Sequence, residues 1–243
     1  MDRPEALNAV STAQARAITA ACAELTADPA LSVVIIRSAV ERAFCVGADL
    51  KERASFSDDD LRAQRPITQA AYGSVLNLAM PTIAAVEGFA LGGGCELALS
   101  CDVIIASTTA VLGLPEVGVG LVPGGGGTQL LPRRVGPHRA AEMIFTGRQV
   151  GAAEALSRGL VDQLVDRGQA GAAARELAAV IASKSPAALR NAKAALRQGA
   201  DVDLATAMLI ENDAWERTAF SADRVEGIAA FSDRRAPRWP DPR

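Results

Sequence analysis

The sequence predicts an α/β fold whose C-terminal part is helical. Short apolar runs rich in β-branched residues alternate with helical patterns through most of the chain, and helical patterns alone follow. With 243 residues, 49% hydrophobic and 22% charged, the chain is long enough to enclose a large core and too apolar to be disordered. These observations favour one medium-sized domain, with or without a small helical appendage.

The apolar runs predict buried strands at residues 31–37, 82–86 and 103–107, and a last strand within residues 160–165. Apolar residues at helical spacing predict helices at residues 8–27, 58–80, 152–158, 170–184, 186–198, 202–218 and 224–233. The glycine-rich segment 112–136 is predicted to be a loop.

Charge and composition argue against several kinds of partner. The net charge of −3 provides no general attraction for nucleic acid or an anionic membrane. The sequence contains no run of about 18 apolar residues, so it predicts no membrane span. The N-terminal sequence lacks a signal pattern, which indicates the cytoplasm. The four cysteines form no C-x-x-C pair, which favours buried apolar thiols over a metal site. They are Cys22, Cys45, Cys95 and Cys101.

Residues 81–101 form the most informative stretch, PTIAAVEGFALGGGCELALSC. A strand pattern breaks at Gly88, glycines occupy positions 92–94, and a helical pattern begins near Glu96. The N-terminal N–H groups of such a helix have no intrahelical acceptor, and glycine allows a ligand oxygen to approach them closely. The stretch fits an oxyanion-binding site, and it equally fits a glycine turn used only for tight packing.

Other catalytic motifs are incomplete. Glycines at positions 124–127 precede Thr128 without the lysine that a phosphate-binding Walker loop requires. His138 is the only histidine, and no G-x-S-x-G elbow accompanies it, so a serine triad is not indicated. No H-E-x-x-H motif or Cys/His cluster indicates metal-assisted hydrolysis.

Two carboxylates and several backbone N–H groups are left as candidates. Glu96 and Glu116 both lie beside glycines in segments poor in other charge. An apolar pocket raises the pKa of a carboxyl group and lets it act as acid or base near neutrality. Residues 44–49, FCVGAD, offer further N–H groups at a turn. Two donors from separate loops and two carboxylates fit chemistry through an enolate-like intermediate.

Four motifs together resemble the enoyl-CoA hydratase/isomerase (crotonase) superfamily: FCVGADLKE, PTIAAVEGFALGGGCELALSCD, GLPEVGVGLVPGGGGTQLLPRRVG and RVEGIAAF. The resemblance covers nearly the whole chain. It implies a crotonase-like core of ββα spiral turns at residues 1–185 and a C-terminal helical trimerisation region at residues 186–243. It also implies an acyl-CoA substrate, a homotrimer or homohexamer, and no cofactor besides the coenzyme A that belongs to the substrate.

The same resemblance implies catalytic residues. The N–H groups of Ala48 and Gly93 would form the oxyanion hole for the thioester carbonyl, each donor typically worth about 3–4 kcal/mol. Glu96 and Glu116 match the two catalytic glutamates of the hydratases. Glu96 would activate the water that attacks C3, and Glu116 would supply the proton to C2. The implied activity is that of an enoyl-CoA hydratase, a hydro-lyase.

Two further residues match positions that contact CoA in the family. Lys51 matches a position near the CoA phosphates, and the alternative is an ordinary surface lysine. Val46 stands where alanine or serine is common, so its bulk would narrow the pocket near the thioester or adenine. Relatives have about two short strands before a segment like RPEALNA, whereas Met1 stands almost at that point here. Either the assigned start is late or an edge hairpin is missing, which would weaken the fold.

The presence of both glutamates favours a hydratase over other reactions of the superfamily. Within the superfamily, the sequence most resembles hydratases that act on methylglutaconyl-CoA and bind AU-rich RNA through a row of lysines (a lysine comb) on the first helix. That helix carries only Arg16 and no lysine here, so we expect no nucleic-acid partner. The alternatives are a methylglutaconyl-CoA hydratase, an enoyl-CoA isomerase, or a catalytically idle binding protein of the same fold.

Overall fold

The computed structural model describes residues 1–240, which belong to two compact units. Unit 1 comprises Met1–Glu24, Ile35–Asn77 and Thr82–Glu176. Unit 2 comprises Leu25–Val34, Leu78–Pro81 and Leu177–Arg243. The cavity described below lies entirely within unit 1, and the last three helices lie within unit 2. The predicted division into a core at residues 1–185 and a trimerisation region at residues 186–243 stays a prediction.

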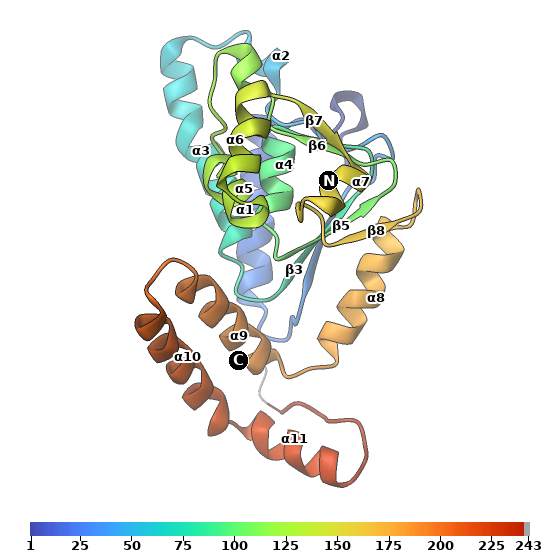
Figure 1. The fold of residues 1–243 in the computed structure, drawn as a ribbon, viewed down its shortest axis with the longest axis vertical. Helices are drawn as coiled ribbons and strands as arrows, with labels where there is room; N and C mark the ends of the chain where they lie inside the picture. Colours follow the sequence, from blue (N-terminus) through green and yellow to red (C-terminus); the bar gives the residue numbers. More distant parts are fainter. Residues whose placement is uncertain (241–243) are drawn as a thin grey trace. The chain divides into compact units, whose positions relative to one another are not determined.

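One sheet has the strand order β1-β3-β5-β8 (Figure 1). Its strands are β1 (Val34–Arg37), β3 (Thr82–Val86), β5 (Val103–Ser107) and β8 (Gln163–Val165). β3 and β8 both run parallel to β5. All five residues of β3 are buried, as expected for an apolar run in a parallel sheet that is covered on both faces. The strands predicted at residues 82–86 and 103–107 are therefore confirmed.

A second sheet has the strand order β2-β4-β6-β7. Its strands are β2 (Ala43–Cys45), β4 (Phe89–Leu91), β6 (Val111–Gly113) and β7 (Gln149–Gly151). The first three are parallel, and β7 runs antiparallel to β6. The carboxyl ends of parallel strands meet at one edge of a sheet. The segments that follow β2, β4 and β6 therefore lie together, although they are far apart in sequence.

The helices before α9 alternate with these strands along the chain (Figure 1). They are α1 (Thr12–Ala27), α2 (Leu50–Arg53), α3 (Asp58–Leu76), α4 (Gly93–Leu99), α5 (Gly127–Val135), α6 (Pro137–Thr146), α7 (Ala152–Ser157) and α8 (Ala170–Ala182), with 3₁₀ turns at Pro4–Ala6 and Glu116–Val119. Every residue of α4 is buried. A Cβ atom on Gly94 would overlap the carbonyl oxygen of Cys45, so glycine allows α4 to pack directly on β2.

Unit 2 contains α9 (Pro186–Gly199), α10 (Leu204–Ala219) and α11 (Ala222–Ser232). Each helix has a side-chain N-cap, because Ser185, Asp203 and Ser221 accept a backbone N–H in the first turn. Ser185 also hydrogen-bonds the buried Asp223 at 2.5 Å, which joins the start of α9 to α11. The helices predicted for this region are confirmed to within about two residues at each end, the usual uncertainty of helix ends.

Several predicted boundaries were wrong. β1 begins at Val34 rather than at residue 31, and the carbonyl of Leu31 accepts a hydrogen bond from Arg190 at 2.9 Å. α3 ends at Leu76 rather than near residue 80, although Leu78 and Met80 stay buried in the segment that follows.

The glycine-rich segment 112–136 is only partly a loop. It contains most of β6, the 3₁₀ turn Glu116–Val119 and helix α5, which begins after Gly126 at φ +116° and buries Leu131 and Val135. The strands β2, β4, β6 and β7 were not predicted from the sequence. Each has three residues, too few to show a period.

Candidate active site

A cavity of about 710 Å³ opens at the carboxyl ends of β2, β4 and β6. Its wall is formed by the loop after β2, the start of α4, the turn after β6, the glycine segment before α5, and one face of α3. Five of the predicted site residues line it: Val46, Ala48, Gly93, Glu96 and Glu116. The edge where parallel strands end is where α/β folds commonly bind ligands.

The loop after β2 turns the N–H of Ala48 away from Val10, the residue with which Ala48 forms an isolated bridge. The N–H of Val10 donates to the carbonyl of Gly47 at 2.7 Å, and the carbonyl of Val10 accepts from the N–H of Asp49 at 3.1 Å. Ala48 is the residue between these two bonds, in a parallel bridge with Val10. In such a pairing the central residue directs its own N–H and C=O to the opposite side. The N–H of Ala48 is therefore free of Val10, and Ala48 lines the cavity.

Gly93 provides a second N–H group on an adjoining loop. It is the first residue of α4, so its N–H has no acceptor within the helix. Gly47, at φ +91°, packs against it: a Cβ atom there would lie 3.0 Å from the nitrogen of Gly93 and 2.9 Å from the carbonyl oxygen of Leu91. Glycine at position 47 thus lets the loop after β2 approach the start of α4.

Glu96 lies in the first turn of α4 with only 2% of its surface exposed. Its Oε1 accepts the N–H of Gly125 at 2.7 Å and the N–H of Gly127 at 2.8 Å. Burial raises the pKa of Glu96, and the N–H groups of the glycine segment, together with the more distant Arg65 guanidinium, oppose that rise. Two fixed donors therefore favour the ionised form of this buried carboxyl group.

Glu116 lies at the start of the 3₁₀ turn after β6. Its Oε2 is buried and has no hydrogen-bond partner among the residues that the structure describes. Burial raises the pKa of Glu116 to about 7, and the charge of Glu96 adds to this rise. The two carboxyl groups share one cavity but differ in their surroundings, since two N–H groups of the glycine segment hold Oε1 of Glu96 and no donor meets Oε2 of Glu116 among the described residues.

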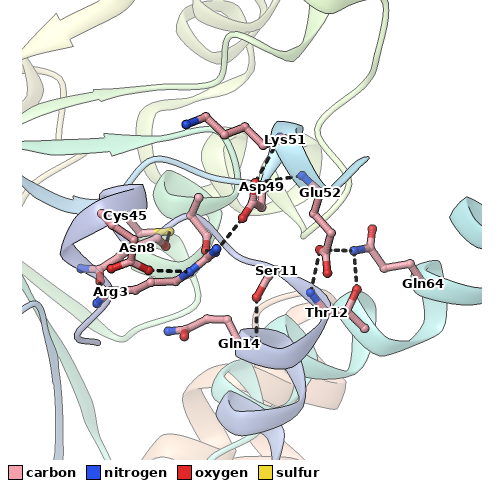
Figure 2. A network of polar contacts seen from close by, with 12 residues as sticks. Arg3, Asn8, Ser11, Thr12, Gln14, Cys45, Asp49, Lys51, Glu52 and Gln64 are labelled. Carbon is pink, nitrogen blue, oxygen red and sulfur yellow. Dashed lines mark hydrogen bonds and ion pairs between the residues drawn. The ribbon is translucent and has the colours of Figure 1, made fainter. Parts of the chain in front are cut away.

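A polar network holds the loop that carries Ala48 (Figure 2). Asp49 is the N-cap of α2, where its Oδ1 accepts the N–H groups of Lys51 and Glu52 at 3.1 Å. Its Oδ2 accepts Nη1 of Arg3 at 2.7 Å, and the same Nη1 donates to the carbonyl of Ala9. Asp49 therefore links the N-terminal segment to the residue that follows Ala48.

The two residues predicted to contact CoA lie in different places. Val46 is half-buried and lines the cavity. Lys51 is exposed on α2, and its side chain is not among those that line the cavity. A role in CoA binding stays a prediction for both residues.

Helix α3 contributes cavity residues that the sequence did not single out. Gln64, Thr68 and Tyr72 follow one another at four-residue spacing, all are buried, and all face the cavity with Arg65. Their spacing marks one face of a helix, which was available from the sequence. Which partner that face meets depends on contacts with Gly93 and Gly125, which only the folded chain provides.

The cysteines and acidic side chains form no metal-binding cluster in the part of the chain that the structure describes. Among residues 1–240, no three His, Cys, Asp or Glu side chains are close enough to hold a metal ion. All four cysteines are buried, and burial raises the pKa of Cys45 to about 11 and that of Cys95 to about 12. No helix within the described part of the chain is long and apolar enough to cross a membrane.

Comparison with solved structures defines the class of this fold. A crystal structure of enoyl-CoA hydratase from Bacillus anthracis is 41% identical, with a TM-score of 0.95, over 98% of this chain and 92% of that one. The fold is therefore the crotonase fold of the enoyl-CoA hydratases. The sequence profile of the family Enoyl-CoA hydratase/isomerase matches residues 1–242, and the chain belongs to this family.

Relatives from other organisms carry more specific names. Enoyl-CoA hydratase domain-containing protein 2, a mitochondrial protein of Mus musculus, is 42% identical over 98% of this chain and 82% of its own length. Methylglutaconyl-CoA hydratase, a mitochondrial protein of Homo sapiens, is 40% identical over 98% of this chain and 72% of its own length. The resemblance found in the sequence is thus confirmed at the level of the family.

Proposed function

We propose that this protein is an enoyl-CoA hydratase that adds water across the 2,3 double bond of a 2-enoyl-CoA thioester. The observation that supports this most strongly is the unequal setting of two carboxyl groups in one cavity. Two N–H donors favour the ionised, basic form of Glu96, whereas burial raises the pKa of Glu116, whose Oε2 has no partner among the described residues, to about 7. Environments that separate two carboxyl groups in this way assign one as base and the other as acid.

Each group then has one task. Glu96 takes a proton from the water, whose oxygen forms a bond to C3, while the π electrons of the double bond move toward C1. The carbonyl oxygen gains negative charge, which the N–H groups of Ala48 and Gly93 stabilise. Glu116 gives its proton to C2, and the carbonyl re-forms. Glu96 ends protonated and Glu116 ionised, and exchange of protons with solvent restores both. Such positioned acid–base groups usually contribute about 10²–10⁴-fold to the rate.

The test is hydration of crotonyl-CoA, followed by the loss of its conjugated absorbance, for wild type, Glu96→Gln and Glu116→Gln. Both glutamines keep the size of the side chain and remove only the acid–base function. We expect each substitution to lower kcat by at least about 10²-fold. Equal rates for all three proteins would overturn the assignment of the two glutamates.

A methylglutaconyl-CoA hydratase is the second candidate. Its substrate has a carboxylate at the far end of the acyl chain, and three arginines line this cavity: Arg53, Arg62 and Arg65. A relative with that name is 40% identical. Activity on 3-methylglutaconyl-CoA with none on crotonyl-CoA would select this reading, and the reverse result would reject it.

Assembly, cofactor use and location are further proposals. We expect a homotrimer or homohexamer, and the apolar side chains that α10 exposes support an interface: Leu204, Met208, Leu209 and Trp215. Sedimentation of the purified protein measures this directly. We expect turnover without an added cofactor, no nucleic-acid binding and a cytoplasmic location, although some relatives are named as mitochondrial.

A further inference from the structure

Tyr72 is the only tyrosine of the chain and lies on the cavity-facing side of α3. Its residue surface is 8% exposed, so the side chain is almost fully enclosed. Its hydroxyl oxygen is not among the fully buried atoms that lack a partner, so it borders the open space of the cavity. Phenylalanine would fill the same volume without presenting a polar group to that space, so the hydroxyl group needs an explanation.

The hydroxyl group has a defined position within the cavity. At one end of the ring, a Cβ atom on Gly125 would lie 2.8 Å from Cδ2 and 2.9 Å from Cγ of Tyr72, and 2.7 Å from Oε2 of Glu96. At the other end, a Cβ atom on Gly93 would overlap the hydroxyl oxygen and lie 3.1 Å from Cζ. The ring therefore lies against Glu96 and Gly125, while the hydroxyl group reaches Gly93, which lines the same cavity.

The hydroxyl group is free to bind a ligand. Tyr72 makes no side-chain hydrogen bond to any residue between 1 and 240, although it lies close to Cys45, Glu96 and Glu116. Burial, with the charges of these neighbours, raises the pKa of Tyr72 well above its usual value. The phenol therefore keeps its proton throughout the working pH range and can act as a donor.

We propose that the hydroxyl group of Tyr72 is a third hydrogen-bond donor to the thioester oxygen, beside the N–H groups of Ala48 and Gly93. This inference rests on the proposed function. As the bond from water to C3 forms, electron density moves from the double bond onto the thioester oxygen, and the O–H of Tyr72 donates to the charge that develops there. Tyr72 keeps its proton throughout, since the proton for C2 comes from Glu116.

The first test is the kinetics of Tyr72→Phe with crotonyl-CoA. A donor that acts mainly on the developing charge affects kcat more than KM. Loss of one oxyanion-hole donor typically costs about 10²–10³-fold in kcat, and we expect a loss of about 10²-fold here. Ser74→Ala is the matched control, because Ser74 is a half-buried hydroxyl residue of the same helix that bonds only the carbonyl of Ala71 and lies outside the cavity. It should keep the wild-type rate.

The second test reports on the carbonyl group without turnover. A 4-dimethylaminocinnamoyl-CoA thioester absorbs at longer wavelength when its carbonyl is polarised by hydrogen bonds. We expect the red shift on binding to be smaller with Tyr72→Phe than with wild type, and unchanged with Ser74→Ala. A merely structural role for Tyr72 would lower the thermal midpoint and leave the red shift of the folded protein unchanged.

The outcomes separate this inference from the proposed function. If wild type hydrates crotonyl-CoA and Tyr72→Phe does so at the same rate, Tyr72 is not a donor and the hydratase assignment stands. A slower Tyr72→Phe with a wild-type red shift also overturns the inference. If wild type turns over neither crotonyl-CoA nor 3-methylglutaconyl-CoA, the proposed function fails, and the red-shift comparison still decides whether Tyr72 polarises a bound carbonyl.

Discussion

Oε1 of Glu96 accepts the backbone N–H of Gly127 at 2.8 Å, although the two residues are 31 positions apart in sequence. The N–H of Gly125 donates to the same oxygen at 2.7 Å. One carboxylate oxygen is thus fixed by the segment before α5, which leaves Oε2 as the oxygen that faces Tyr72 and the cavity. The glycine segment that the sequence predicted to be a simple loop orients this catalytic candidate.

Gly125→Ala should displace Glu96 and lower kcat by about 10²-fold, because small misplacements of a reacting group have effects of that size. The new Cβ atom would lie 2.7 Å from Oε2 of Glu96 and 2.8 Å from the ring of Tyr72. Gly118→Ala is the control, since no atom lies within 4 Å of a Cβ there and the residue is exposed. Steady-state kinetics with crotonyl-CoA measures both. Equal rates for the two variants would show that the glycine segment does not orient Glu96.

The hydration rate should fall as the pH rises through about 7. Glu116 must be protonated to give a proton to C2, and burial raises its pKa to about 7. The value of kcat/KM reports the ionisations of the free enzyme, so it should decrease about tenfold per pH unit above that pKa. Glu116→Gln has no such group, and its residual activity should lack this limb. A wild-type profile that stays flat from pH 6 to pH 9 would exclude Glu116 as the acid.

Glu116 should also make stability depend on pH, with a sign opposite to that of a salt-bridged carboxylate. Its pKa is about 7 in the folded protein and 4.5 when unperturbed, so the folded state holds the proton more strongly. This contribution to the free energy of unfolding is complete below about pH 4.5 and is lost as the pH rises to about 7. The thermal midpoint of Glu116→Gln minus that of wild type should therefore increase as the pH rises from 5 to 8. A constant difference across that range would contradict the raised pKa.

Asp49→Ala should destabilise the protein by roughly 2–4 kcal/mol. It removes the N-cap of α2, worth about 1 kcal/mol, and a hydrogen bond between charged groups, worth about 1.5–3 kcal/mol. Glu5→Ala is the matched control, because Glu5 binds the same Arg3 at 3.1 Å but its side chain is 69% exposed. Exposed pairs of this kind contribute about 0–1 kcal/mol.

Denaturant unfolding compares the two variants, and kinetics then tests the catalytic consequence. Since Asp49 adjoins Ala48, folded Asp49→Ala should have a lower kcat than Glu5→Ala. Similar unfolding free energies for the two variants would mean that the partly buried ion pair of Arg3 and Asp49 does not hold the loop.

The sequence was most informative where chemistry is local. Glu96 could be named as a candidate from its glycine-flanked position, and the resemblance to the family added Ala48 and Gly93, before any contact was known. The buried strand at residues 82–86 could be predicted as well, because five apolar or β-branched residues in a row are typical of a buried strand. Three-residue strands such as β2 and β4 could not, because their existence depends on each other's hydrogen bonds.

Tyr72, Gly125 and Arg3 show what the sequence could not reveal. Tyr72 sits in an ordinary helical pattern, and only the overlap between its hydroxyl group and a Cβ at Gly93 indicates a role. Arg3 is one of many charged residues until its 2.7 Å contact with Asp49 is known. Contacts between positions far apart in sequence leave no periodic signal along the chain.

By itself, the sequence determined the family, the succession of strands and helices, and the residue types available for catalysis, because these follow from local pattern and motif. The tertiary structure alone decided which groups meet. Parallel pairing of β2, β4 and β6 brings three loop ends to one edge, and that edge encloses Glu96 and Glu116 in a single cavity. Burial and donor count then separate the two carboxyl groups, since desolvation and hydrogen bonds depend on neighbours rather than on residue type.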